Sequence, residues 1–296
     1  MGKALAEWSK RARAVYEQAD EALGFELSAV CFEGPEELLI RTENAQPAIV
    51  TTSIALLEAL RECHPDLPSP AYAAGHSLGE YSALVAAGAL SLPDAVRVVR
   101  ERGRAMQTAV PAGQGAMAAI MGASDEQIAA LCAEAAEGEV LAPANFNAPG
   151  QTVIAGTRSA VDRAVELSKT HKLKAVPLKV SAPFHCSLMA PAAVSVARSL
   201  AAISLADPAF PVVANVDAQP NAAKDRIADL LVQQVDSPVR WHASIQTIAD
   251  AGVTRALEIG PGKVLAGLAK RIDKRVSVLS VNDQESVEKT AEFLAS

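Results

Sequence analysis

The clearest chemical signal in this chain is a serine flanked by glycines. Gly75-His76-Ser77-Leu78-Gly79 matches the pattern G-x-S-x-G, which places a serine on a sharp turn between a strand and a helix in nucleophile elbows. Residues 71–74 predict a short strand, and a helix is expected to begin near Leu78. We therefore predict that Ser77 is a nucleophile and that the N–H of Leu78 stabilises an oxyanion. A glycine-rich turn with a capping serine is the alternative.

A nucleophilic serine needs a base, and the chain has five histidines. His185 lies in Ser181-Ala182-Pro183-Phe184-His185-Cys186-Ser187, a loop after a predicted strand, where catalytic groups tend to gather. The other histidines lie in less suitable places. His76 is next to Ser77, but its side chain is expected to point away, and the other three are His64 in a Pro-rich loop, His171 at a Lys-rich helix end and His242 on a predicted helix. His185 is therefore the best candidate base.

The elements that must position these residues alternate between strand and helix patterns. This order predicts an α/β fold, with an α/β-hydrolase-like large domain built on a largely parallel sheet. Between residues 113 and 181 the order becomes β-α-β-β-α-β, which is the ferredoxin-like motif. We therefore expect a ferredoxin-like small domain at 113–181, inserted into a large catalytic domain formed by 1–112 and 182–296.

Composition excludes several classes of function. The net charge of −7 argues against bulk nucleic-acid binding, and no stretch approaches the roughly 18–20 apolar residues of a membrane span. Four scattered cysteines predict neither disulfides nor a zinc site, so we expect a cytoplasmic protein. Gly260-Pro261-Gly262-Lys263 fails the phosphate-loop pattern, because Leu257 and Val264 occupy the required glycine and hydroxyl positions. We expect no cofactor, no metal and a monomer.

Five separated blocks carry a resemblance to a known family, and they are GHSLGEYSALVAAGAL, ERGRAMQTAVPAGQGAMAAIMG, NFNAPGQTVIAG, SAPFHCSLM and EIGPGKVLAGLAKRI. In this order they resemble the malonyl-CoA:acyl carrier protein transacylase family over nearly the whole chain. The resemblance implies ping-pong transfer of a malonyl group from malonyl-CoA to the phosphopantetheine thiol of acyl carrier protein. A malonyl-serine ester is the intermediate, and the product supplies type II fatty-acid synthesis.

The resemblance also assigns roles to residues. Ser77 is the nucleophile, His185 is its base, and Arg102 grips the malonyl carboxylate with a guanidinium fork. Without the family match, Arg102 reads as one of several solvated arginines along a helix. Gln234 matches a glutamine whose main-chain carbonyl holds the histidine in place of an acid, although Asp217 and Asp236 remain open as acids of a conventional triad.

Further pocket residues follow from the same resemblance. Phe184 resembles the phenylalanine associated with malonyl over methylmalonyl selection, although a core phenylalanine in a loop is the simpler interpretation. Asn147, together with Asn145, is expected to line the pocket; turn formation explains both asparagines as well.

The match departs from the family at the N-terminus. Relatives open with a short apolar strand and a Gly-Gln-Gly-Ser-Gln loop, whose first glutamine supplies a second oxyanion-hole N–H, whereas Met1-Gly2-Lys3 aligns just after that loop. We expect the sheet to lack a strand beside the nucleophile strand. Loss of one oxyanion donor typically costs ~10²–10³ in turnover, so we expect the chain as written to fold poorly or act weakly.

Three rival functions remain open at this point: a serine esterase or thioesterase, an inactive relative that acts only in binding, and the same transfer in polyketide synthesis. Carrier proteins are acidic as a class, so docking requires local positive charge. Two clusters offer it, and they are Lys169, Lys172 and Lys174, or Lys270, Arg271, Lys274 and Arg275. Solvated helix faces explain both clusters equally well.

Overall fold

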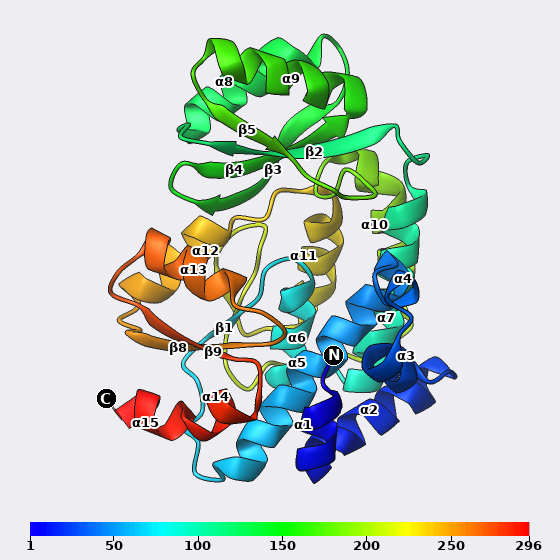
Figure 1. Ribbon diagram of the computed structural model, residues 1–296, viewed down its shortest axis with the longest axis vertical. Coiled ribbons are helices and arrows are strands. Elements are labelled where there is room, and N and C mark those ends of the chain that lie inside the picture. Colours follow the sequence, from blue (N-terminus) through cyan, green and yellow to red (C-terminus); the bar gives the residue numbers. More distant parts are fainter. Residues whose placement is uncertain (296) are drawn as a thin grey trace.

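The computed structural model describes residues 1–295 and has the predicted mixed α/β architecture (Figure 1). Its helices are α1 Lys3–Trp8, α2 Lys10–Leu23, α3 Leu27–Glu33, α4 Glu36–Leu39, α5 Thr42–Cys63, α6 Leu78–Ala86, α7 Leu92–Thr108, α8 Asp125–Ala136, α9 Arg158–Thr170, the 3₁₀ turn Ser187–Met189, α10 Ala190–Ala201, α11 Lys224–Asp236, α12 Trp241–Asp250, α13 Val264–Ile272, α14 Gln284–Glu288 and α15 Thr290–Ala295. Its strands are β1 Ala73–Ala74, β2 Gly115–Met121, β3 Leu141–Ala148, β4 Gln151–Thr157, β5 Lys174–Pro177, β6 Val212–Val213, β7 Pro220–Asn221, β8 Arg255–Ile259 and β9 Ser277–Val281.

The large sheet is divided into two pieces. β1 pairs in parallel with β6, which pairs antiparallel with β7, and β8 pairs in parallel with β9. Within residues 1–295 no strand pairing joins these two sheets. They nevertheless share the same apolar layers, because Ala73 and Leu257 pack against one hydrophobic cluster and Ala74 and Val278 against another. The strands are largely parallel, as predicted, but the sheet is not continuous.

Helix α5 forms the centre of the large core. It is apolar or small nearly all round, as expected of a helix that is buried on every side, and it packs against α2, α6 and α7. Helix α7 is amphipathic instead. Its buried positions include Val98, Val99, Arg102 and Met106, which lie three or four residues apart and therefore share one face. The helix period thus directs Arg102 into the core.

The strands between residues 115 and 177 form a separate sheet in the order β3-β4-β2-β5, with every pairing antiparallel. Helices α8 and α9 cover its outer face, and the large part of the molecule lies against the other side (Figure 1). Ser124 and Gln127 form a capping box at the start of α8. The element order is that of the predicted ferredoxin-like motif; the domain limits at 113 and 181 stay a prediction.

The N-terminal helical segment is divided at Ser9, whose side chain accepts a hydrogen bond from the N–H of Ala12 and caps α2. Helices α3, α4, α14 and α15 were not predicted from the sequence. Every helix within residues 1–295 is too short or too polar to cross a membrane.

Candidate active site

Ser77 lies on a strained turn between β1 and α6. Its backbone angles are φ 50° and ψ −103°, a region that residues other than glycine rarely adopt. Asn215, two residues after β6, spans this turn with one side chain. Its Oδ1 accepts a hydrogen bond from the N–H of Ser77 at 2.6 Å, and its Nδ2 donates to the carbonyl of Gly75 at 2.7 Å. The neighbouring strand therefore holds the nucleophile turn from both sides.

The two glycines of the motif are not equivalent. A Cβ atom on Gly75 would lie 2.0 Å from the carbonyl carbon and oxygen of Gly79, whereas a Cβ atom on Gly79 would meet nothing within 4 Å. Gly75 is needed because helix and strand approach too closely for any side chain. Gly79 lies in the first turn of α6, and no steric reason requires glycine there.

Ser77 and His185 are in hydrogen-bond contact, with 2.7 Å between Oγ and Nε2. The other ring nitrogen of His185 lies 2.8 Å from the main-chain carbonyl of Gln234. Because a carbonyl can only accept, Nδ1 carries the proton and Nε2 is free to receive one from Ser77. The structure therefore has a serine–histidine dyad held by a backbone carbonyl.

The two aspartates considered as triad acids have other partners. Asp217 pairs with Arg226 at 3.0 Å, and Asp236 accepts a hydrogen bond from Ser237. The Nδ1 atom of His185 is hydrogen-bonded to Gln234 instead, so neither aspartate orients the base.

His185 is buried, with 3% of its surface exposed. Burial, followed by the positive charge of Arg102, lowers the pKa of His185 to about 3. Both effects disfavour the imidazolium form. The ring is therefore neutral in the resting protein, as a proton acceptor must be.

Arg102 contacts the nucleophile directly. Its Nη2 atom donates to Ser77 Oγ and to Gln234 Oε1, each at 2.9 Å, and its Nη1 donates to Gln46 Oε1 at 2.9 Å. The residue is 2% exposed, and its Nε–H is buried with no acceptor among the described residues. Burial lowers the pKa of the Arg102 guanidinium. The alternative of a solvated surface arginine is wrong for Arg102, while Arg97 and Arg104 do form exposed pairs with acidic neighbours on α7.

The remaining predicted residues surround this centre. Leu78 begins α6, so its N–H has no intrahelical acceptor. Phe184 is partly buried between the large core and the small-sheet core. Asn147 on β3 hydrogen-bonds through Oδ1 to Nε2 of His76 at 2.8 Å, so this ring nitrogen has a partner other than Ser77. Asn145 forms a backbone bridge with Val239.

Three residues of the site were not identified from the sequence: Asn215, Gln46 and Glu80. Glu80 accepts a hydrogen bond from Gln234 at 2.8 Å. Glu80 lies one residue beyond the G-x-S-x-G motif, and Asn215 follows the strand that pairs with the nucleophile strand. Both are polar residues within otherwise apolar segments, which was the signal in the sequence that could have identified them. Gln46 offered none, because it lies near the start of α5, where Thr42, Glu43 and Asn44 are also polar.

Within residues 1–295, no group of three or more His, Cys, Asp or Glu side chains is placed so that it could hold a metal ion. The N-terminus of α13, after the Gly260–Lys263 loop, is filled by the carboxylate of Glu258, which accepts from the N–H groups of Leu265 and Ala266. A bound phosphate would compete with that carboxylate, which agrees with the sequence argument against a phosphate loop.

Residues 1–289 match the family model of the acyl transferase domain. The malonyl CoA-acyl carrier protein transacylase of Bacillus subtilis is 48% identical over 290 residues, covering 97% of this chain and 90% of the relative. The enzyme of the same name from Escherichia coli K12 is 48% identical over 273 residues, covering 92% and 88%.

Solved structures show the same likeness. The malonyl CoA-acyl carrier protein transacylase of Coxiella burnetii superposes with a TM-score of 0.96 at 40% identity, covering 100% of this chain and 93% of that one. A malonyl-transacylase in complex with its type II PKS acyl-carrier protein gives a TM-score of 0.95 at 44% identity, covering 99% and 94%. The sequence resemblance is confirmed, and the chain belongs to the malonyl-CoA:acyl carrier protein transacylase family of acyl transferase domains.

Proposed function

We propose that this protein transfers the malonyl group of malonyl-CoA to the phosphopantetheine thiol of acyl carrier protein, through a malonyl ester on Ser77. The observation that carries the proposal is the buried guanidinium of Arg102, 2.9 Å from Ser77 Oγ. A cation at this place favours an acyl group that ends in a carboxylate, because an arginine fork binds a carboxylate through two parallel hydrogen bonds.

In the first half-reaction, Nε2 of His185 takes the proton of Ser77 Oγ as the oxygen attacks the thioester carbonyl. Negative charge develops on the carbonyl oxygen, where the N–H of Leu78 and the start of α6 stabilise it. The carbon–sulfur bond then breaks, and the proton on His185 passes to the sulfur of the departing CoA. The malonyl ester remains on Ser77, with its carboxylate bound by Arg102.

The second half-reaction reverses these roles. The phosphopantetheine thiol gives its proton to His185 and attacks the ester carbonyl. The bond between the carbonyl carbon and Ser77 Oγ breaks, and the proton returns to Oγ. No cofactor or metal takes part in these steps. We propose that Phe184 and Asn147 lie along the acyl pocket and that fatty-acid synthesis receives the product.

For the acidic carrier protein we propose the basic cluster at the end of α13. Helix α13 packs against β3, and Arg271 hydrogen-bonds to Gln151 at the start of β4, so this cluster lies where the small sheet meets the large part of the molecule. Lys169 lies at the end of α9, on the outer face of the small sheet (Figure 1), and pairs with Glu166 at 2.7 Å. The α13 cluster is therefore nearer to the junction of the two parts.

The cellular compartment and the oligomeric state complete the proposal. All four cysteines are free, and three of them are buried, as suits a reducing compartment. We propose a cytoplasmic monomer.

The first experiment is incubation with malonyl-CoA, an acid quench and an intact-mass measurement. We expect the mass of one malonyl group on the wild type and on a Ser199→Ala control, and none on Ser77→Ala. Phosphopantetheinylated acyl carrier protein should then remove the label and gain it. An esterase would instead release free malonate at the same rate with or without the carrier, and absence of any adduct would favour an inactive relative.

A further inference from the structure

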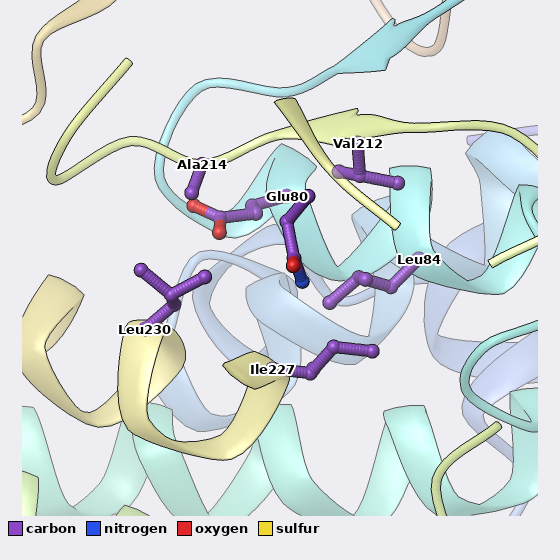
Figure 2. A pocket seen from close by; sticks show the side chains of 7 residues that line it. Glu80, Leu84, Val212, Ala214, Ile227 and Leu230 are labelled. Carbon is purple, nitrogen blue, oxygen red and sulfur yellow. The ribbon is translucent and has the colours of Figure 1, made fainter. Parts of the chain in front are cut away.

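Glu80 is a buried carboxylate that the reaction described above does not use. It lies one helical turn after Ser77 near the start of α6, and 3% of it is exposed. The side chain lies among apolar neighbours that include Leu84, Val212 and Leu230 (Figure 2). Burying an ionisable group among apolar side chains is costly for folding, so this carboxylate calls for a reason beyond packing.

Two hydrogen bonds converge on one oxygen of this carboxylate. Its Oε2 atom accepts from Nε2 of Gln234 at 2.8 Å and from the backbone N–H of Asn215 at 3.0 Å. The donors come from α11 and from the loop after β6, which are far from α6 in sequence. A single atom of Glu80 therefore joins three segments of the chain.

The first donor, Gln234, serves three groups of the active site. Its Nε2 also donates to the carbonyl of Ser77 at 2.9 Å, its Oε1 accepts from Arg102 at 2.9 Å, and its main-chain carbonyl holds His185 at 2.8 Å. With two acceptors on its nitrogen side, the amide has one favourable orientation. The reverse orientation would place an NH₂ group against the Arg102 guanidinium and an oxygen against the Glu80 carboxylate.

The second donor, Asn215, holds the nucleophile turn. Its side chain binds the N–H of Ser77 and the carbonyl of Gly75, as described above. Its own backbone is fixed by the bond to Glu80. Glu80 thus supports both residues that position the nucleophile, the base and the carboxylate-binding arginine.

Burial and the neighbouring groups act on the pKa of Glu80 in opposite directions. Burial raises the pKa of Glu80 to about 7, against the opposing effects of its two hydrogen bonds and of the Arg102 charge, while the charge of Asp217 raises it further. The positive charge that lowers this pKa belongs to Arg102, whose guanidinium we assign to the malonyl carboxylate.

We propose that Glu80 is a positioning residue of malonyl transfer, which holds the Gln234 amide and the Asn215 backbone so that Arg102, His185 and Ser77 stay aligned. The inference rests on the proposed function. Glu80 acts through its two donors and does not touch the substrate. A carboxylate oxygen or an amide oxygen can fill this role, whereas an apolar side chain of the same size cannot.

The test compares three variants with the wild type. Glu80→Leu removes the acceptor at nearly constant volume, and Glu80→Gln keeps an acceptor oxygen. Leu84→Ala is the matched control, because Leu84 lies one turn later on α6 and its apolar side chain faces the same small cavity as Glu80 (Figure 2). The measurements are the rate of malonyl-serine formation, the KM for malonyl-CoA, the malonyl-to-acetyl rate ratio and the melting temperature.

For Glu80→Leu we expect the rate of malonyl-serine formation to fall about 100-fold, the scale of an ångström-sized misplacement. The malonyl-to-acetyl ratio should fall with it, because Arg102 loses the orientation that Gln234 gives it. Glu80→Gln should recover the rate to within about threefold, since an amide oxygen still accepts. Leu84→Ala should lower the melting temperature through its cavity and keep the malonyl-to-acetyl ratio.

Three results would overturn the inference: an unchanged rate in Glu80→Leu, an equal loss in Glu80→Gln, or a similar loss of selectivity in Leu84→Ala. Should Glu80→Leu not fold, Glu80→Asp takes its place, because the shorter side chain withdraws the carboxylate from Gln234 while keeping its charge. A wild type that forms no malonyl-serine would contradict the proposed function instead, and the two failures are therefore distinct.

Discussion

Arg102 donates a hydrogen bond to Ser77 Oγ at 2.9 Å, and the same oxygen lies 2.7 Å from Nε2 of His185. The guanidinium therefore acts before any substrate carboxylate arrives, because a positive charge beside Oγ favours the alkoxide. After acylation that oxygen belongs to an ester and is a weaker acceptor. The carboxylate of a malonyl group then becomes the stronger partner for the same cation.

Removal of Arg102 should therefore harm both substrates, but unequally. We expect Arg102→Ala to reduce kcat/KM for malonyl-CoA by ~10²–10³, the range for loss of a buried charged hydrogen-bond partner. Acetyl-CoA should lose about tenfold, because it depends only on the contact with Ser77. Kinetics with both thioesters measure this, and Arg104→Ala on the exposed face of α7 is the control. Equal losses for the two thioesters would contradict carboxylate binding by Arg102.

The pH dependence of acylation follows from His185. An ordinary histidine becomes protonated below pH 6.5, whereas the pKa of His185 is lowered to about 3 by burial and by Arg102. Between these values the base stays neutral, so malonyl-serine formation should show no loss centred near pH 6.5. Rapid-quench mass measurements from pH 5 to 8 test this. The Glu80→Gln variant is measured in parallel, because the pKa of Glu80, raised to about 7, falls in the same range. A rate that halves near pH 6.5 in both proteins would show that His185 has an ordinary pKa.

Asn215 should be required for both stability and acylation. Asn215→Ala leaves the N–H of Ser77 and the carbonyl of Gly75 without partners, at about 1–3 kcal/mol for each buried unsatisfied group. We expect a matching fall in the free energy of unfolding and a large loss of malonyl-serine formation.

Asn221→Ala provides the control for Asn215, because Asn221 is also buried and also makes two hydrogen bonds to backbone, both with Ala223. It should lose stability and keep its acylation rate per folded molecule. Similar acylation losses in the two variants would reduce Asn215 to a purely structural role.

The two glycines of the elbow should respond in opposite ways to substitution by alanine. Gly75→Ala places a Cβ atom 2.0 Å from backbone atoms of Gly79, so we expect several kcal/mol of destabilisation and no activity. Gly79→Ala meets open space in a helix, where alanine is favoured over glycine by about 1 kcal/mol. Chemical denaturation of both variants measures the difference in the free energy of unfolding. Equal destabilisation would show that Gly79, like Gly75, has no room for a side chain.

Reversal of charge in the basic cluster at the end of α13 should weaken transfer to the carrier without affecting the first half-reaction. For Lys270→Glu combined with Lys274→Glu, we expect the KM for acyl carrier protein to rise about tenfold with a smaller salt dependence. Malonyl-serine formation from malonyl-CoA should be unchanged. The matched control reverses Lys169 and Lys172 at the end of α9. A larger effect from this control would move the docking surface to the small sheet.

The fold was predictable wherever local patterns decide it. Serine is favoured at helix N-caps, and Ser91 and Ser124 cap α7 and α8. The order of strands and helices likewise indicates a largely parallel sheet and a ferredoxin-like one. The division of the large sheet could not be foreseen from the strand patterns themselves, because hydrophobic periodicity identifies strands but not their hydrogen-bonded neighbours.

The turn that carries Ser77 was predictable because its motif is local, whereas the residues that support the turn are distant in sequence. Ser77 is marked by a glycine two residues away on each side. Asn215, in contrast, lies 138 residues after Ser77 in sequence, and Gln46 comes from a different helix. Such contacts depend on tertiary packing, which a single sequence does not display. The burial of Arg102 lies between these cases, because the helical period of α7 already indicates its face.

Both members of the dyad have left-handed backbones, with φ 50° at Ser77 and φ 61° at His185. Conformations of this kind cost about 1–3 kcal/mol each for residues other than glycine. Glycine at either position would relieve this backbone strain, but it would also remove the side chain that the proposed chemistry needs. A serine and a histidine at two positions whose backbone suits glycine therefore indicate that these positions are set by chemistry and not by backbone preference.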